Sequence, residues 1–380
     1  MPSVQDALDE IEKHLEENPD DAAAWNSKGV LLADKKDFGA ALRALERAIR
    51  LNPELAEAYT NRGRVLISIG PENAKKALDS FNTALELSPD NVQALKDKAF
   101  ALRIVGKSQQ ELETIHRLLD RVPDQWGIWI RRGDLELEIG RTEQSIDSYN
   151  RALEINPDAV PALVHRGIAF SLIEEWGDAI DSAKRATELA PEELEPWRVL
   201  GDIYLRAEKF GSAMKALQEA AHLDPDDPTI ENTMGMAAFK RGHEREAIKH
   251  FKRALVKKRD YAPALKNLGF ISMEIEEWEQ ARKAWKRLTR LVKDDPAVWN
   301  AAATTYAKLN DFCSAADAWE KARKMLKRKG KEKAAERIHE LHRAARINCS
   351  KQKKAERERR KQEKATRSFR DRFSLRKKRD

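Results

Sequence analysis

A period of 34 residues runs through most of this 380-residue chain and limits the folds that it can adopt. One position of the period carries a large apolar residue, at Trp25, Tyr59, Leu95, Trp129, Leu163, Trp197, Leu265 and Trp299. Each step is 34 residues except one of 36, after Tyr59, and one of 68, where Glu231 stands at the midpoint. Such self-similarity indicates a repeat architecture, in which each unit buries its apolar face against its neighbours.

Small residues keep the same register. Glycine follows the first large residue by four positions in seven repeats, and Ala99 and Ala303 replace it in the third and ninth. A second large apolar residue comes about twenty positions after the first, as in Leu45, Phe81, Tyr149, Leu217, Phe251, Trp285 and Trp319. Prolines such as Pro53 and Pro157 follow, where they end a helix. Each repeat is therefore predicted to be two antiparallel helices that approach closely at the small residues.

This pattern resembles the tetratricopeptide repeat over about residues 22–326. The sixth repeat comes near the family consensus, with Trp197, Leu200, Gly201, Tyr204, Ala213, Leu217, Ala220 and Pro225. The resemblance implies an all-α fold, a right-handed superhelical solenoid of antiparallel helix pairs, with about nine repeats and capping helices. It also implies a non-catalytic interaction scaffold that binds peptides or partner-protein segments.

The two ends of the chain depart from the repeat. Residues 1–21 are expected to form an N-terminal capping helix, and the solenoid is expected over 22–330, with 36 residues in its second repeat. A C-terminal capping helix is expected over 331–347, where apolar residues step by three and four. Residues 348–380 have few apolar side chains, so a basic, disordered tail is expected there.

Charge and cysteine usage suggest a compartment. Residues 323–380 hold 25 Lys and Arg against 8 Asp and Glu, so this end carries +17 and residues 1–322 carry −10. Cys313 and Cys349 indicate neither a disulfide framework nor a zinc site, which favours a reducing environment. With no signal peptide and no apolar stretch long enough to span a bilayer, we expect a cytoplasmic protein.

Residue spacings typical of enzymes are missing from the sequence. Gly106-Lys107-Ser108 resembles the end of a phosphate-binding loop, but Ala101 stands where that loop needs a glycine. His339 and His342 have no matching set of metal ligands. We therefore expect no catalytic residue, no cofactor and no metal.

The family resemblance implies that the first helix of each repeat lines a concave groove. The predicted partner-binding residues are Lys96, Phe100, Arg131, His165, Arg198, Met236, Phe239, Lys240, Lys266, Phe270 and Met273. The Met and Phe residues would form an adaptable apolar patch if they face the groove, and core if they pack between repeats. The cations would bind an acidic peptide, or belong to an ordinary solvated face shared with Asp134 and Asp202.

The basic end offers a second candidate surface, anchoring an adaptor to nucleic acid or the ribosome. Its candidate contacts are Lys351, Lys353, Lys354, Arg357, Arg359, Arg360, Lys361, Phe369 and Phe373. Cations release counterions from a phosphate backbone, and phenylalanine stacks on bases. An acidic protein, an anionic lipid surface, the acidic solenoid itself and simple solubilisation are the alternatives. The partner, the pathway and the oligomeric state stay open.

Overall fold

Helices make up most of the backbone that the computed structural model describes, residues 3–376, and no strand occurs in that range. Side chains are described for residues 3–366. The chain divides into an N-terminal half, Met1–Pro191, and a C-terminal half, Glu192–Asp380. The all-α class predicted from the sequence is confirmed.

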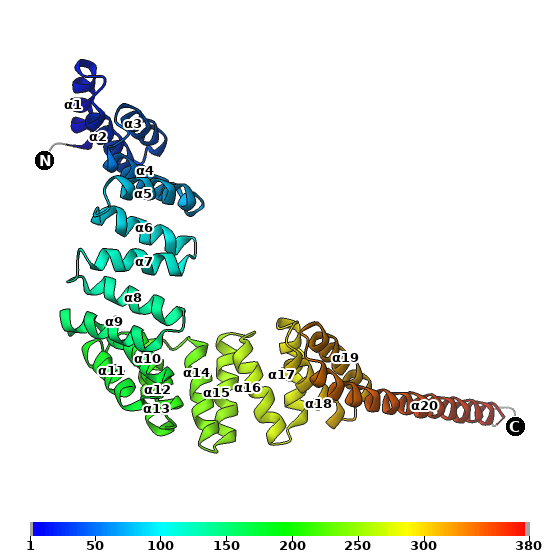
Figure 1. Cartoon of the computed structure of the whole chain (residues 1–380). Coiled ribbons are helices and arrows are strands. Elements are labelled where there is room, and N and C mark those ends of the chain that lie inside the picture. Colours follow the sequence, from blue (N-terminus) through cyan, green and yellow to red (C-terminus); the bar gives the residue numbers. More distant parts are fainter. Residues whose placement is uncertain (1–2, 377–380) are drawn as a thin grey trace. The chain divides into compact units, whose positions relative to one another are not determined.

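The N-terminal half begins with a single helix and continues in helix pairs (Figure 1). Its helices are α1 (Val4–Glu17), α2 (Ala22–Asp34), α3 (Phe38–Leu51), α4 (Ala56–Ile69), α5 (Ala74–Leu87), α6 (Val92–Ile104), α7 (Ser108–Leu119), α8 (Trp126–Glu138), α9 (Thr142–Ile155), α10 (Val160–Leu172) and α11 (Trp176–Leu189). Leu8 and Leu15 bury the apolar face of α1, which packs on α2, and Ser3 caps the start of α1.

The C-terminal half continues the same alternation and ends in a long helix (Figure 1). Its helices are α12 (Leu194–Arg206), α13 (Phe210–Leu223), α14 (Pro228–Lys240), α15 (Glu244–Lys257), α16 (Ala262–Glu274), α17 (Trp278–Leu291), α18 (Pro296–Lys308), α19 (Phe312–Arg328) and α20 (Glu332–Arg376). In both halves, the even-numbered helix of each pair is the first helix of a repeat, and the next odd-numbered helix is the second.

The glycine of each repeat makes room for the large residue of the second helix. A Cβ added to Gly269 would stand 2.5 Å from Cε2 of Trp285, and one on Gly133 would stand 2.5 Å from Cε1 of Tyr149. Real side chains do not approach so closely, so the ring packs directly on bare helix backbone. Trp285 and Tyr149 are accordingly among the fully buried side chains.

Left-handed backbone closes the turn between the two helices of a pair. Eleven positions after the first large residue, three repeats place a glycine with positive φ, namely Gly106, Gly140 and Gly242. Five others hold Lys36, Glu174, Glu208, Glu276 and Asn310 in the same conformation. The second repeat instead has its two extra residues here and forms a 3-10 turn, Pro71–Asn73.

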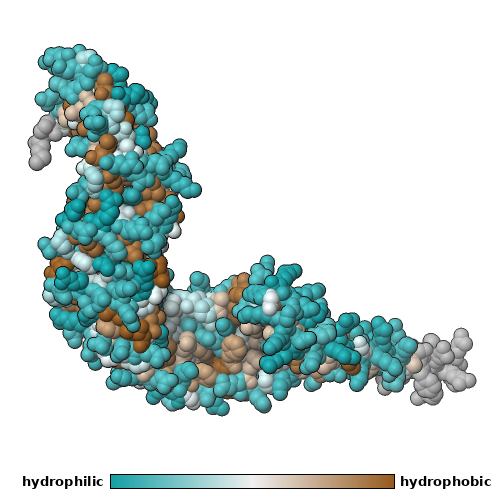
Figure 2. Space-filling view, viewed as in Figure 1, coloured by the Kyte–Doolittle hydropathy of each residue, from teal (hydrophilic) through white to brown (hydrophobic). Residues whose placement is uncertain are grey.

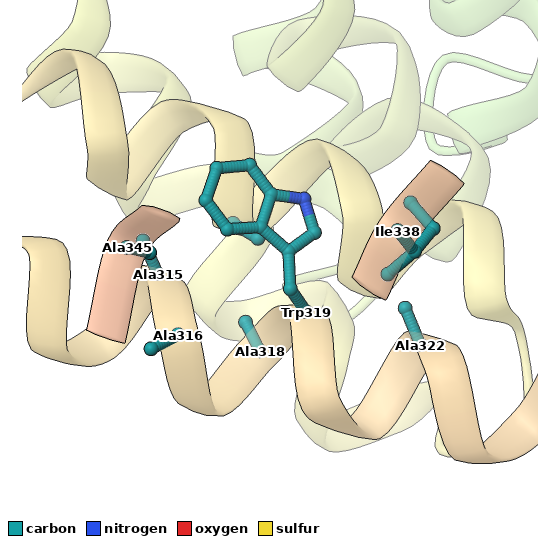
Figure 3. Close-up of a cluster of buried hydrophobic side chains, with 8 residues drawn as sticks. Ala315, Ala316, Ala318, Trp319, Ala322, Ile338 and Ala345 are labelled. Atoms are coloured by element: carbon teal, nitrogen blue, oxygen red, sulfur yellow. The ribbon is translucent and has the colours of Figure 1, made fainter. Parts of the chain in front are cut away.

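The predicted end of the capping helix at 347 is wrong, because α20 runs on as one helix to Arg376. Its first part packs on α19, where Ile338 and Ala345 cover Trp319 (Figure 3). The expected disorder after 348 is therefore also wrong for the described backbone. Helix-forming Ala, Glu, Lys, Arg and Gln dominate the segment, Gly and Pro are missing from 332–376, and Glu356 pairs with Arg360 one turn on.

A disulfide joins Cys313 to Cys349, which contradicts the sequence-based expectation of two unpaired thiols. Their Cα atoms lie 4.8 Å apart, one near the start of α19 and the other on α20. The spacing of cysteines in the sequence could not show this, because the pairing depends on α20 folding back along α19. The bond ties α20 to the last helix pair just before residue 350, from which every described side chain of α20 is exposed.

Candidate partner-binding surface

The predicted groove residues all lie on first helices, and each half contains its own group. Lys96 and Phe100 are on α6, Arg131 is on α8 and His165 is on α10. In the C-terminal half the residues are Arg198 on α12, Met236, Phe239 and Lys240 on α14, and Lys266, Phe270 and Met273 on α16.

The apolar residues of α14 and α16 divide between surface and core. Met236 and Phe270 are 38% and 46% exposed. Phe239 instead packs against the buried cluster around Phe251, and the Met273 sulfur accepts a hydrogen bond from Nε1 of Trp285 at 3.2 Å. Met236 and Phe270 therefore fit the surface alternative drawn from the sequence, and Phe239 and Met273 fit the core alternative.

Arg131 is held by Glu111, the residue that breaks the pattern of the third repeat. Nε and Nη2 of Arg131 donate to the two carboxylate oxygens of Glu111 at 2.7 and 2.9 Å. Glu111 on α7 is only 2% exposed, and this hydrogen bonding raises the pKa of Arg131. Glu111 thus links the third repeat to the fourth by an ion pair. Arg131, which was predicted to contact a partner, is therefore paired within the chain.

Glu231, the acid of the seventh repeat, is also buried in an ion-pair cluster. Its Oε2 lies 2.7 Å from Nδ1 of His250, and its Oε1 accepts from Nζ of Lys257 at 3.3 Å. Burial raises the pKa of Glu231, but the His250 hydrogen bond and the Lys257 charge outweigh it and leave the pKa below its ordinary value. Both sequence irregularities are therefore paired acids inside the repeats.

Two other predicted cations are also paired within the chain. Nδ1 of His165 lies 2.7 Å from Asp134, which also accepts from the Tyr149 hydroxyl at 2.9 Å. Arg198 donates to Glu195 in its own helix, and this raises the pKa of the guanidinium. In contrast, Lys96, Lys240 and Lys266 are exposed and have no carboxylate within 4.0 Å among the described side chains.

A hollow of about 170 Å³ opens between α6, α7 and α8. Its lining consists of Lys96, Ala99, Phe100, Arg103, Glu111, Ile115, Leu118, Gly127, Ile128 and Arg131. It brings together three predicted residues, Lys96, Phe100 and Arg131. Sequence reasoning missed Arg103 and Gly127, although the signal existed, since every other repeat has a side chain at the register of Gly127.

The basic residues predicted at the C-terminal end lie along α20. All side chains from 350 to 366 are exposed, and Figure 2 shows a mostly hydrophilic surface there. Arg359 and Arg360 pair with Glu363 and Glu356, one turn away. The side chains of Phe369 and Phe373 lie outside the described residues. No helix in the described part of the chain has the length and apolar character needed to cross a bilayer.

Comparison with known proteins agrees with this architecture. Tetratricopeptide-repeat family models match residues 3–56, 34–92, 106–160, 173–228 and 238–304. A TPR repeat-containing protein of Rhizobium etli is 30% identical over 142 residues, which cover 32% of this chain and 69% of that protein.

Two further similarities are more limited. A TPR repeat-containing thioredoxin of Arabidopsis thaliana is 29% identical over 101 residues, and the match spans 27% of this chain and only 26% of that protein. The crystal structure of yeast Tom70 superposes with a TM-score of 0.54 at 13% identity, covering 91% of this chain and 93% of Tom70. From its helix pairs, its repeat register and these matches, the chain belongs to the tetratricopeptide repeat family.

Proposed function

We propose that this protein is a non-catalytic scaffold that holds peptides or partner-protein segments on the face formed by its first helices. One observation carries the proposal. Phe100, Met236 and Phe270 occupy the same register, five positions after the first large position of their repeats, and all three are exposed. A large apolar residue repeated at one exposed register supports an interaction surface.

Each of these apolar residues has a lysine one helical turn away. Lys96 stands four positions before Phe100, Lys266 four before Phe270, and Lys240 four after Met236. Residues four apart are neighbours on a helix surface. The resulting surface offers an apolar contact beside a cation without a nearby carboxylate, which suits a partner segment that carries both apolar and acidic side chains.

Two other parts of the sequence-based prediction belong to this proposal. We propose from the family that the protein has no enzymatic activity. One relative is named a thioredoxin, but the match covers only 26% of that protein. A cytoplasmic location is also proposed; in that reducing compartment the Cys313–Cys349 disulfide of the folded chain would be open to reduction. Trapping the thiols with an alkylating reagent at the moment of lysis tests this location, because a fully oxidised pair would contradict it.

Capture of partners from a lysate by full-length variants tests the proposed surface. The double variant Met236→Asp/Phe270→Asp places charge on the first-helix face. Val256→Asp is the matched control, because Val256 is 85% exposed on α15, a second helix of the same half. We expect the control to retain the wild-type partners and the double variant to lose them. Equal retention by both variants, each checked for an unchanged melting curve, would remove the first helices as the binding surface.

A nucleic-acid contact through α20 is a second candidate, favoured by its charge. Residues 350–366 are all exposed and hold eight Lys and Arg against three Glu. The test is RNA binding across a salt titration, with Lys351, Lys353 and Lys354 changed together to Gln. Loss of these cations should lower the salt dependence of binding. An unchanged slope, or no RNA binding by the wild type, rejects this candidate.

A further inference from the structure

We propose that the hollow between α6, α7 and α8 anchors one bulky apolar side chain of an acidic partner segment. The inference rests on the proposed scaffold function and specifies which chemistry the partner brings to the N-terminal half. Its three supports are the size of the hollow, the reason that it exists, and the charge of its rim.

The hollow has the size of one large side chain. Its volume is about 170 Å³, and Ala99, Phe100, Ile115, Leu118 and Ile128 supply apolar walls. An apolar cavity of about 150 Å³ admits a benzene molecule. A leucine, isoleucine or phenylalanine side chain would therefore fill this one.

At the contact between repeats three and four, one side chain is smaller than its counterparts in several repeats and another is missing. Ile115 occupies the register where five other repeats have Phe, Tyr or Trp. Gly127, the second residue of α8, provides no side chain, and a Cβ added there would meet nothing within 4 Å. Among neighbouring first helices of the N-terminal half, α6 and α8 also approach each other least.

The rim of the hollow is positive after its internal pairing is considered. Glu111 is the one acid of the lining, and Arg131 binds both of its carboxylate oxygens. The other two cations of the lining, Lys96 and Arg103, have no carboxylate within 4.0 Å among the described side chains. Arg103 instead lies over the Phe100 ring, 5.0 Å from its centroid.

This charge selects among possible occupants. Acidic residues that flank the anchoring side chain would complement Lys96 and Arg103, and hydrogen bonds between charged groups are stronger than neutral ones. The basic α20 segment is disfavoured as an internal ligand, because it has the same sign of charge as the rim. A nucleobase stacked on Phe100 is the competing occupant, and the test below distinguishes it.

The experiment measures binding of labelled synthetic peptides to the full-length protein by fluorescence anisotropy. The probe is an acidic peptide with one central leucine. Its controls are the same peptide with a central alanine, the leucine peptide with lysines in place of the acids, and a labelled oligouridine. We expect the acidic leucine peptide to bind about tenfold or more tighter than each control, which corresponds to about 1.4 kcal/mol.

Two glycine substitutions then locate the binding. Gly127→Leu fills the hollow, whereas Gly177→Leu is its matched control. Gly177 is also the second residue of a helix in the N-terminal half, and a Cβ added there also meets nothing within 4 Å. Replacing a helical glycine should preserve or raise stability in both variants. We expect Gly127→Leu to weaken the peptide at least about tenfold and Gly177→Leu to leave it unchanged.

Several results would overturn the inference. They are a wild type that does not bind the acidic leucine peptide, equal affinity for the alanine peptide, an unaffected Gly127→Leu variant, and tighter oligouridine binding that Gly127→Leu abolishes. The scaffold proposal is tested separately. If Met236→Asp/Phe270→Asp loses its captured partners, the scaffold proposal is supported even when the peptide does not bind in the hollow.

Discussion

The buried pair of Glu111 and Arg131 leads to an asymmetric prediction. Arg131→Ala removes the guanidinium partner of Glu111, a residue that is only 2% exposed in the fold. Removing one partner of a buried ion pair costs about 3 to 5 kcal/mol. The cost should lie at the lower end, about 3 kcal/mol, because the Arg131 side chain is itself 23% exposed and some hydration already reaches the pair.

The reverse substitution should cost much less. Glu111→Ala restores the alanine that seven other repeats have at this register. The Arg131 head group can then turn to water and to Glu138, whose Oε1 already lies 3.6 Å away. We expect a loss of about 1 to 2 kcal/mol for Glu111→Ala, and no more than about 2 kcal/mol for the double variant.

Hydrogen exchange measured by mass spectrometry suits this test, because repeat arrays open locally and a global unfolding midpoint averages over them. The free energy of opening of peptides within α7 and α8 should fall most in Arg131→Ala and recover in the double variant. Equal losses in the two single variants, or additive losses in the double variant, would show that the pair has no coupling and would refute the reasoning.

Three further predictions concern Glu231, the glycines and the disulfide. The pKa of Glu231 is lowered in the fold, so the ionised carboxylate should contribute its full stabilisation above pH 4.5, the ordinary pKa of the group. This stabilisation should disappear as the pH falls through the lowered pKa. Urea midpoints measured between about pH 6 and 3 should show this loss in the wild type but not in Glu231→Gln. Gly140→Ala, in an open left-handed turn, should cost about 1 kcal/mol, whereas Gly269→Ala, which collides with Trp285, should cost more, about 2 to 3 kcal/mol; equal urea midpoints would contradict the packing argument. Reduction of Cys313–Cys349, which closes a loop of 36 residues, should destabilise the docking of α20 on α19 by about 3 to 4 kcal/mol, and unchanged hydrogen exchange in α20 after reduction would disprove it.

The repeat period predicted the fold well because it reports the packing directly. Glycine and a large residue about sixteen positions later recur together, because the large residue packs on the bare backbone of the glycine, as Trp285 does on Gly269. The left-handed inter-helix turn has a weaker signal. Glycine takes it in three repeats, but Glu174, Glu208 and Glu276 occupy it in others, so that residue type alone does not reveal the conformation.

Long-range pairing accounts for most of what sequence reasoning missed. Glu111 stands where most repeats have alanine, but its partner Arg131 lies in the next repeat and was predicted to line the groove. The disulfide forms because α20 folds back along α19, which the sequence spacing does not show. Residues 348–376 are helical because of their helix propensity, although their low apolar content predicted disorder. The hollow is lined by residues of three helices, α6, α7 and α8, and no single one of these residues predicts it.

The most direct test of the central claim is hydroxyl-radical footprinting of the full-length protein with and without a captured partner. The scaffold account predicts that a bound partner protects Phe100, or Met236 and Phe270, from modification while Val256 on α15 reacts as in the free protein. Protection of Val256 with unchanged reactivity of Phe100, Met236 and Phe270 would place the partner on the second helices and contradict the account.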